Sequence, residues 1–198
     1  MSKYILFSLL LLAVIPFFIN EFTEPENMSD SLNSDLKNEL KTAHIPFIEN
    51  IGQINNDKVK YYANTFAGTI YVSDNDLLYL SNPKNNTSWA TKEIFVNGKI
   101  SPSGQEKSPT IVNYFKGDSK NWKSDIPTYQ TLSLGEVWPS IQVELKAYGN
   151  NMEKVFTVYP GADISDIKNS FEGITKLGID ETGQLVIDTD FGQTKFSK

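Results

Sequence analysis

The sequence predicts an all-β domain, built as a mostly antiparallel sandwich or as layered sheets and preceded by a signal or anchor helix and a short helical spacer. Short β-prone runs recur along the chain, and Gly, Pro and Asn residues separate them. Aromatic residues, which favour half-buried pleated surfaces, make up 12% of the sequence. A content of 39% hydrophobic and 21% charged residues is typical of a globular chain.

Residues 1–20 have the pattern of an export signal. Lys3 precedes an apolar run from Tyr4 to Ile19, and a positive start followed by such a run is typical of a secretory signal. The run is short for a membrane span, which needs about 20 apolar residues. No A-x-A cleavage pattern follows it, so residues 4–19 are expected either to be removed or to stay as a membrane anchor. The protein is therefore predicted to be secreted or held at the cell surface.

Residues 21–44 are predicted to form a polar spacer with one short helix. Leu32, Leu36 and Leu40 are four residues apart within residues 31–41, which places them on one helical stripe. The β-rich extracellular domain is then expected to cover residues 45–198.

Alternation and turn signals define the expected strands of this domain. Between Ile141 and Ala147 every second residue is apolar, which predicts a strand with one wet face. Asn97-Gly98 predicts a two-residue hairpin that joins residues 94–96 to residues 99–100. The other expected strands are residues 58–62, 69–72, 77–80, 155–159, 177–179, 185–188 and 194–196.

The sequence predicts no catalytic residue, no cofactor and no metal site, and hence no enzyme. His44 is the single histidine and cysteine is absent, which excludes multi-histidine and thiolate metal sites within one chain. The pairs at Asp74 and Asp76 and at Asp188 and Asp190 lack the rest of a calcium loop and are expected at turns. A glycoside-active enzyme is the weakest alternative, and its two carboxylates would be Glu136 and Glu153.

The charged residues argue against a nucleic-acid partner. The net charge is −6 and all 18 basic residues are lysines, whereas arginine is the side chain preferred for bidentate phosphate recognition. Contact with a membrane is expected through the N-terminal segment alone, if that segment is kept.

Several segments together carry a family resemblance. They are Pro46–Gln53, Val59–Ala63, Asn113–Gly117, Trp122, Ile126–Tyr129, Glu136–Ile141, Tyr148–Asn150, Glu153–Phe156, Tyr159–Asp163, Ile167, Phe171–Gly173 and Gly183–Leu185. In order and spacing, the chain resembles the N-terminal domain found ahead of SBBP β-propeller-type repeats in secreted and cell-surface proteins of bacteria and archaea. The resemblance implies an extracellular β-rich module with no established activity. It also implies either a stand-alone copy or a truncated N-terminal domain, because such proteins continue into repeats near the position of Lys198.

The leading functional hypothesis is a non-catalytic structural or interaction module whose partner is a cell-surface protein or a glycan. The alternative is a carbohydrate-binding β-sandwich, and its candidate contact residues are Trp89, Trp122 and Trp138. Trp122 and Trp138 lie beside turn residues, where large rings either anchor core corners or form sugar platforms. Three residues, Asn27, Asn85 and Asn86, fit the glycosylation sequon.

Overall fold

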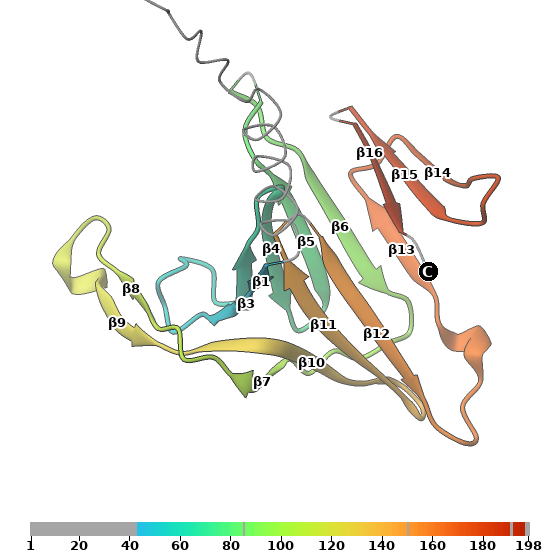
Figure 1. Cartoon of the computed structure of the whole chain (residues 1–198), viewed down its shortest axis with the longest axis horizontal. Coiled ribbons are helices and arrows are strands. Elements are labelled where there is room, and N and C mark those ends of the chain that lie inside the picture. Colours follow the sequence, from blue (N-terminus) through green and yellow to red (C-terminus); the bar gives the residue numbers. More distant parts are fainter. Residues whose placement is uncertain (1–42, 85, 150, 191, 197–198) are drawn as a thin grey trace, which may run out of the picture.

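The computed structural model describes residues 43–84, 86–149, 151–190 and 192–196, and they form an all-β protein of antiparallel sheets (Figure 1). The all-β fold class predicted from the sequence is confirmed. The signal segment at residues 1–20, the spacer helix at residues 31–41, and Asn27 and Asn85 lie outside the described residues. Within the described ranges, no helix has the length and apolar character needed to cross a membrane.

The first layer is an antiparallel run of five strands. It comprises β3 (Val59–Asn64), β4 (Gly68–Ser73), β5 (Asp76–Ser81), β6 (Ala90–Phe95) and, later in the chain, β13 (Asn169–Glu172). The Ser73 hydroxyl closes the turn between β4 and β5, because it accepts hydrogen bonds from the backbone N–H groups of Asn75 (3.1 Å) and Asp76 (3.0 Å). Such local side-chain bonds explain why these polar residues mark the end of a strand.

The second layer has β10 and β11 at its centre. It comprises β7 (Ser103–Lys107), β10 (Thr128–Trp138), β11 (Ile141–Tyr148) and β12 (Met152–Val158). The predicted alternation along β11 is confirmed, since its residues from Ile141 to Ala147 are fully buried at every second position and exposed or half-buried between them. Pro139 and Ser140 form the short connection from β10, and Ser140 adopts a positive φ of 59°.

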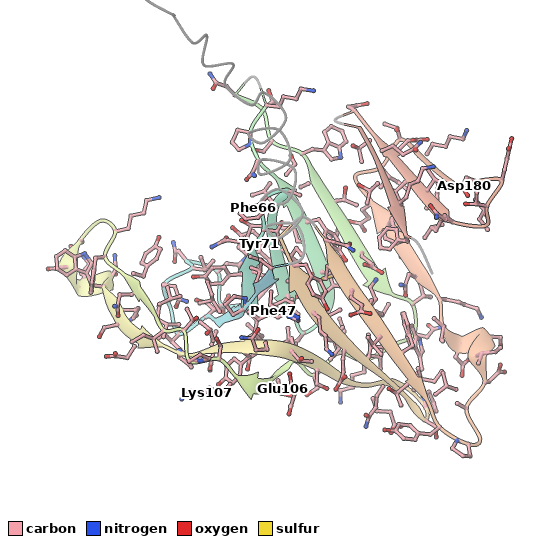
Figure 2. The ribbon with its side chains drawn as sticks, viewed as in Figure 1. Phe47, Phe66, Tyr71, Glu106, Lys107 and Asp180 are labelled. Carbon is pink, nitrogen blue, oxygen red and sulfur yellow. The ribbon has the colours of Figure 1, made fainter. Side chains whose placement is uncertain are left out.

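Of the two short N-terminal strands, β2 (Phe47–Glu49) joins the two layers into one eleven-stranded sheet. It pairs with both β10 and β3, and β1 (His44–Ile45) lies along the end of β11. Figure 2 shows Phe47 in the middle of the body. The main core draws Val72, Leu77 and Phe95 from the first layer and Leu132, Leu134, Trp138, Ile141, Val143 and Leu145 from the second. Each fully buried Leu, Ile or Val contributes roughly 1.5–3 kcal/mol, so this shared core holds the two layers together.

The hairpin predicted at Asn97-Gly98 is wrong. A tight turn does form there, since Asn97 has a φ of 57° and the Gly98 N–H donates to the Phe95 carbonyl (3.0 Å). The chain then crosses to the second layer, where the Lys99 N–H donates to the Val137 carbonyl (2.9 Å). A Cβ on Gly98 would lie 2.7 Å from Val137 Cγ1. The glycine therefore serves close packing of a crossover between layers and does not serve a strand-to-strand hairpin.

Two smaller sheets extend from the body on opposite sides in Figure 1. The first, called the arm (residues 111–126), is the hairpin of β8 (Val112–Tyr114) and β9 (Lys123–Ile126), with the single-turn 3₁₀ helix η1 (Ser119–Asn121) between them. The second, called the C-terminal sheet, follows the 3₁₀ helix η2 (Ile164–Asp166). It comprises β14 (Lys176–Ile179), β15 (Leu185–Thr189) and β16 (Gly192–Phe196), which confirms the three strands predicted there.

Candidate functional site

The arm is held in shape by its own side chains. The Asp118 carboxylate caps η1, because it accepts a hydrogen bond from the Lys120 N–H (3.1 Å) and lies 3.1 Å from Lys120 Nζ. These two interactions with Lys120 lower the pKa of Asp118. Across the hairpin, the Asn113 side-chain oxygen accepts from the Asp125 N–H (3.0 Å) and supports that residue at a φ of 56°. The arm therefore has a defined conformation.

An exposed aromatic pair, Phe115 and Trp122, lies where the arm turns. The two rings meet edge to face with centroids 5.3 Å apart, yet 61% of Phe115 and 48% of Trp122 remain exposed. The Trp122 indole N–H donates to the Gly117 carbonyl (3.2 Å), which fixes the ring against the turn. Ile111, at the base of the arm, is exposed as well. Large apolar side chains that gather on one exposed element are typical of interaction sites.

The arm also carries three lysines close in sequence to the aromatic pair. Residues 111–126 contain three lysines (Lys116, Lys120 and Lys123) and two aspartates (Asp118 and Asp125), so the arm has a net charge of 3 − 2 = +1 in a chain of net charge −6. The Asp118 carboxylate is itself paired with Lys120. The arm is therefore a basic and aromatic element on an acidic protein.

The three tryptophans predicted as contact residues have three different surroundings. Trp138 is 3% exposed, and its indole N–H donates to the Val96 carbonyl (3.0 Å). Trp89 is half-buried, and its indole N–H donates to the Gly173 carbonyl (2.5 Å), which ties the start of β6 to the end of β13. Of the three rings, Trp122 is the most exposed, so it is the one best placed to contact a ligand.

A polar hollow of about 380 Å³ opens in the loop between β2 and β3. Its polar lining comes from Asn50, Asn55, Asn56, Asp57 and Lys60. The Asn50 side chain organises this loop, since it donates to the Val59 carbonyl (2.8 Å) and accepts from the Gly52 N–H (3.1 Å). Lys123 of the arm borders the loop, because a Cβ on Gly52 would lie 3.5 Å from Lys123 Cε. The hollow and the arm are therefore neighbours.

A buried ion pair between β6 and β12 is the main polar feature that the sequence analysis missed. The Glu93 side chain is fully buried, the Lys154 side chain is 9% exposed, and the Lys154 ammonium donates to Glu93 Oε1. The Tyr79 hydroxyl (2.7 Å) and the Asn169 side-chain amide (2.6 Å) also donate to the Glu93 carboxylate. Burial, and then the charge of Glu93, raise the pKa of Tyr79 well above its ordinary value. Its hydroxyl therefore stays protonated and able to donate.

The same ion pair reaches the C-terminal sheet. Lys154 Nζ lies 5.6 Å from the centroid of the Phe95 ring and 5.5 Å from that of the Phe196 ring. Phe196 belongs to β16 and also contacts Phe171 of β13, with ring centroids 6.1 Å apart. Lys154 thus contacts both Phe95 of the main core and Phe196 of the C-terminal sheet, which gives it a structural role.

The comparison with protein families covers both layers, the arm and the C-terminal sheet. Residues 47–198 match the family described as a domain of unknown function, DUF7948. The chain belongs to the DUF7948 family. No curated protein and no solved structure matches it. The family description assigns no activity, so the function of this DUF7948 domain has to be argued from its own residues.

The acidic pairs of this DUF7948 domain take part in local bonds at turns and strand ends. Asp76 accepts a hydrogen bond from the Ser73 hydroxyl (2.7 Å), and Asp188 accepts one from the Gln193 side-chain amide (2.8 Å). Among the residues that the structure describes, no group of three or more His, Asp or Glu side chains gathers closely enough to hold a metal ion.

The two glutamates considered for glycoside chemistry are not brought together. Glu136 of β10 and Glu153 of β12 lie on either side of β11, where Glu136 pairs with Gln142 and Glu153 pairs with Lys146. Four residues along a strand correspond to about 13 Å, whereas glycosidase carboxylates lie roughly 5–9.5 Å apart. Their hydrogen bonds also lie at opposite ends of β11, since Glu136 accepts from the Ser140 N–H and Glu153 from the Tyr148 hydroxyl.

The remaining residues singled out from the sequence lie at the surface of the DUF7948 domain. His44 is exposed at the start of β1, with its ring centroid 4.6 Å from that of Tyr148. Asn86 is exposed between β5 and β6 and has a φ of 59°. Among the described residues, neither position belongs to a group of three or more His, Asp or Glu side chains that could hold a metal ion.

Proposed function

We propose that this DUF7948 chain is an exported, non-catalytic interaction module that docks at the cell surface through the aromatic pair of its arm. The observation that carries the proposal is the exposure of Phe115 and Trp122 on an element that projects from the body (Figure 1). The signal pattern at residues 1–20 supports export. The resemblance to the domain that precedes SBBP repeats supports a place at the cell surface.

Other residues in the family-like segments have structural roles. Asn50 organises the loop after β2, Trp138 fills the core, and Gln53 donates to the Glu49 carbonyl (2.6 Å). Phe115 and Trp122 lie in the same kind of segment, but neither belongs to a buried cluster. Large aromatic rings are among the residues that contribute most to binding energy at interfaces. Their exposure on the arm therefore supports a contact role.

A retention assay on intact cells of the source organism tests this function. Labelled protein is compared with the double variant Phe115→Ala/Trp122→Ala and with Ile164→Ala, which removes an even more exposed apolar side chain from η2. We expect the arm variant to lose at least about tenfold in apparent affinity, as for interface hot spots. The Ile164 variant should bind like wild type. Equal retention of all three proteins would contradict the proposal.

Export is tested separately by fractionation of the source organism. The protein is expected in the medium or at the cell envelope. Recovery in the soluble cytosolic fraction alone would rule out the cell-surface role.

A carbohydrate-binding module is the second candidate, and the polar hollow favours it. Amide and carboxylate side chains such as Asn55 and Asp57 suit the hydroxyl groups of a sugar, and the hollow adjoins Lys123 of the arm. Affinity electrophoresis against a panel of soluble polysaccharides tests this candidate. Carbohydrate binding predicts retardation that Asp57→Ala and Trp122→Ala each abolish. Mobility that no polysaccharide changes would remove this candidate.

A further inference from the structure

We infer that the partner of the arm is the surface of an anionic lipid bilayer, and that Phe115 and Trp122 insert among its headgroups. The inference rests on the proposed function, because it names the partner of the same contact element. Three features of the described residues support it: the shape of the arm, the satisfaction of its hydrogen-bond donors and the distribution of its charge.

The shape of the arm favours a deformable partner. The hairpin that carries the aromatic pair stands away from the body (Figure 1), and the two rings lie at 60° to each other. Two exposed rings at this angle form an uneven apolar surface where the arm turns. A bilayer adapts to such a surface, and tryptophan is enriched at the level of lipid headgroups.

Three hydrogen-bond donors near the aromatic pair are satisfied within the arm. The Asn121 N–H donates to the Asp118 carbonyl (2.9 Å), and the Trp122 N–H donates to the Ser119 carbonyl (3.1 Å). The Trp122 indole N–H donates to the Gly117 carbonyl (3.2 Å). Removing unpaired donors from water is costly. This turn therefore enters a partly dehydrated layer at a lower cost than an open loop would.

The charge of the arm favours an anionic bilayer over a neutral one. The three lysines of the arm outnumber its two aspartates, so the arm has a net charge of 3 − 2 = +1, while the whole chain has a net charge of −6. An anionic surface attracts the arm and repels the body, so it orients the protein with the arm foremost. Each lysine near such a surface strengthens binding about fivefold.

Fluorescence quenching by brominated lipids tests the inference with the full chain. Vesicles with brominated acyl chains are made either from equal parts of phosphatidylcholine and phosphatidylglycerol or from phosphatidylcholine alone. Trp122→Phe serves as the control, because it removes one emitter and keeps an aromatic ring. The apolar run at residues 4–19 is the same in both proteins, so the difference between them reports on the arm.

We expect quenching of wild-type emission on the anionic vesicles to exceed that of Trp122→Phe, and the two proteins to match on neutral vesicles. Lys116→Glu should weaken binding, so that half of the Trp122-dependent quenching requires at least about tenfold more vesicles. The matched charge reversal Lys176→Glu on β14 should leave it unchanged. Urea denaturation checks that each variant is folded.

Several outcomes would overturn the inference. They are equal quenching of wild type and Trp122→Phe on anionic vesicles, equal quenching on neutral and anionic vesicles, and a wild-type response of Lys116→Glu. If Trp122 fails to contact lipid while Phe115→Ala/Trp122→Ala still loses cell retention, the arm binds a surface protein or glycan. The proposed function would then stand without the bilayer. If the arm variant changes neither lipid quenching nor cell retention, both the bilayer inference and the proposed function are rejected.

Discussion

Replacing Lys154 by methionine should destabilise the domain substantially, because it leaves a buried carboxylate without its cation. Methionine keeps most of the apolar length of lysine, so the packing against Phe95 and Phe196 is largely preserved. What is lost is the charge that faces Glu93, whose side chain is fully buried. The variant therefore isolates the electrostatic contribution of the pair.

The expected loss in the free energy of unfolding is about 3 kcal/mol. Removing one partner of a buried pair costs roughly 3–5 kcal/mol. The lower end applies because Tyr79 and Asn169 still donate to the Glu93 carboxylate. The cation–π contacts of Lys154 with Phe95 and Phe196 are lost with the same charge and are counted within this figure. For a domain of this size, the melting temperature should fall by about 6–12 °C.

Urea denaturation followed by circular dichroism measures the loss, and a double-mutant cycle assigns it to the pair. The single variants are Lys154→Met and Glu93→Gln, and the third is their combination. We expect the combined variant to be more stable than the sum of the single losses predicts, with a coupling of at least about 1 kcal/mol. A loss below about 1 kcal/mol for Lys154→Met, or strict additivity, would refute the reasoning.

Three further variants test the rest of the fold. Trp138→Ala should cost about 3–5 kcal/mol by urea denaturation, because it empties a buried aromatic position and leaves the Val96 carbonyl without the indole N–H; Trp122→Ala is the matched control and should change stability by less than about 0.5 kcal/mol. A wild-type midpoint for Trp138→Ala would reject its core role. Gly98→Ala should cost about 1–3 kcal/mol in the same assay, since its Cβ would lie 2.7 Å from Val137 Cγ1; a neutral result would show that the crossover relaxes freely. Asp180, on the outer turn of the C-terminal sheet (Figure 2), has a lowered pKa because it accepts from the Thr182 hydroxyl and pairs with Lys195. A lowered folded-state pKa means that its stabilisation is complete above the unfolded value of about 3.9 and is lost as the pH falls further. Amide exchange in β14–β16 should therefore be slower in wild type than in Asp180→Asn at neutral pH, and this advantage should shrink below about pH 4; an advantage that does not depend on pH would contradict the assignment.

Local patterns predicted the strands whose neighbours are also local in sequence. Alternation from Ile141 to Ala147 predicted β11, and the turn residues around Asp74 predicted the boundary between β4 and β5. The C-terminal sheet followed from the same signals, because each of its strands pairs with the next one along the chain. In these cases, side-chain period and turn chemistry are sufficient.

The crossover after β6 depends on a contact that the local sequence does not contain. Asn97-Gly98 has the composition of a hairpin turn, yet the chain leaves its own sheet because Gly98 packs against Val137 of β10. Tertiary packing therefore decides between two connections that share the same turn residues.

The sequence does not predict the buried ion pair, because Glu and Lys side chains are almost always exposed. Glu93 lies two residues before Phe95, and Lys154 lies two residues before Phe156, so the alternation of each strand already placed the charge on the inner face. The pairing itself joins residues 61 apart in the sequence. The alternation of apolar residues predicts that each charge faces inward, but only the arrangement of the two layers shows that the two charges pair.

The sequence singles out Trp122 as a candidate contact residue, but it does not predict that Trp122 pairs with Phe115. Phe115 becomes part of the site only through the fold of the hairpin, which places the centroids of the two rings 5.3 Å apart. Exposure separates Trp122 from Trp138, although both lie beside turn residues in family-like segments. Burial depends on the whole fold, so the sequence left both roles open for both rings.

Photo-crosslinking from position 115 tests most directly whether the arm is the contact element. Phe115 is replaced by the photoreactive residue benzoylphenylalanine in one protein, and Ile164, exposed on η2, is replaced in another. Each protein is bound to intact cells of the source organism and irradiated. The proposed function predicts covalent adducts from position 115 and none from position 164, and the bilayer inference predicts that the adducts carry lipid. Adducts from position 164 without adducts from position 115 would contradict the account.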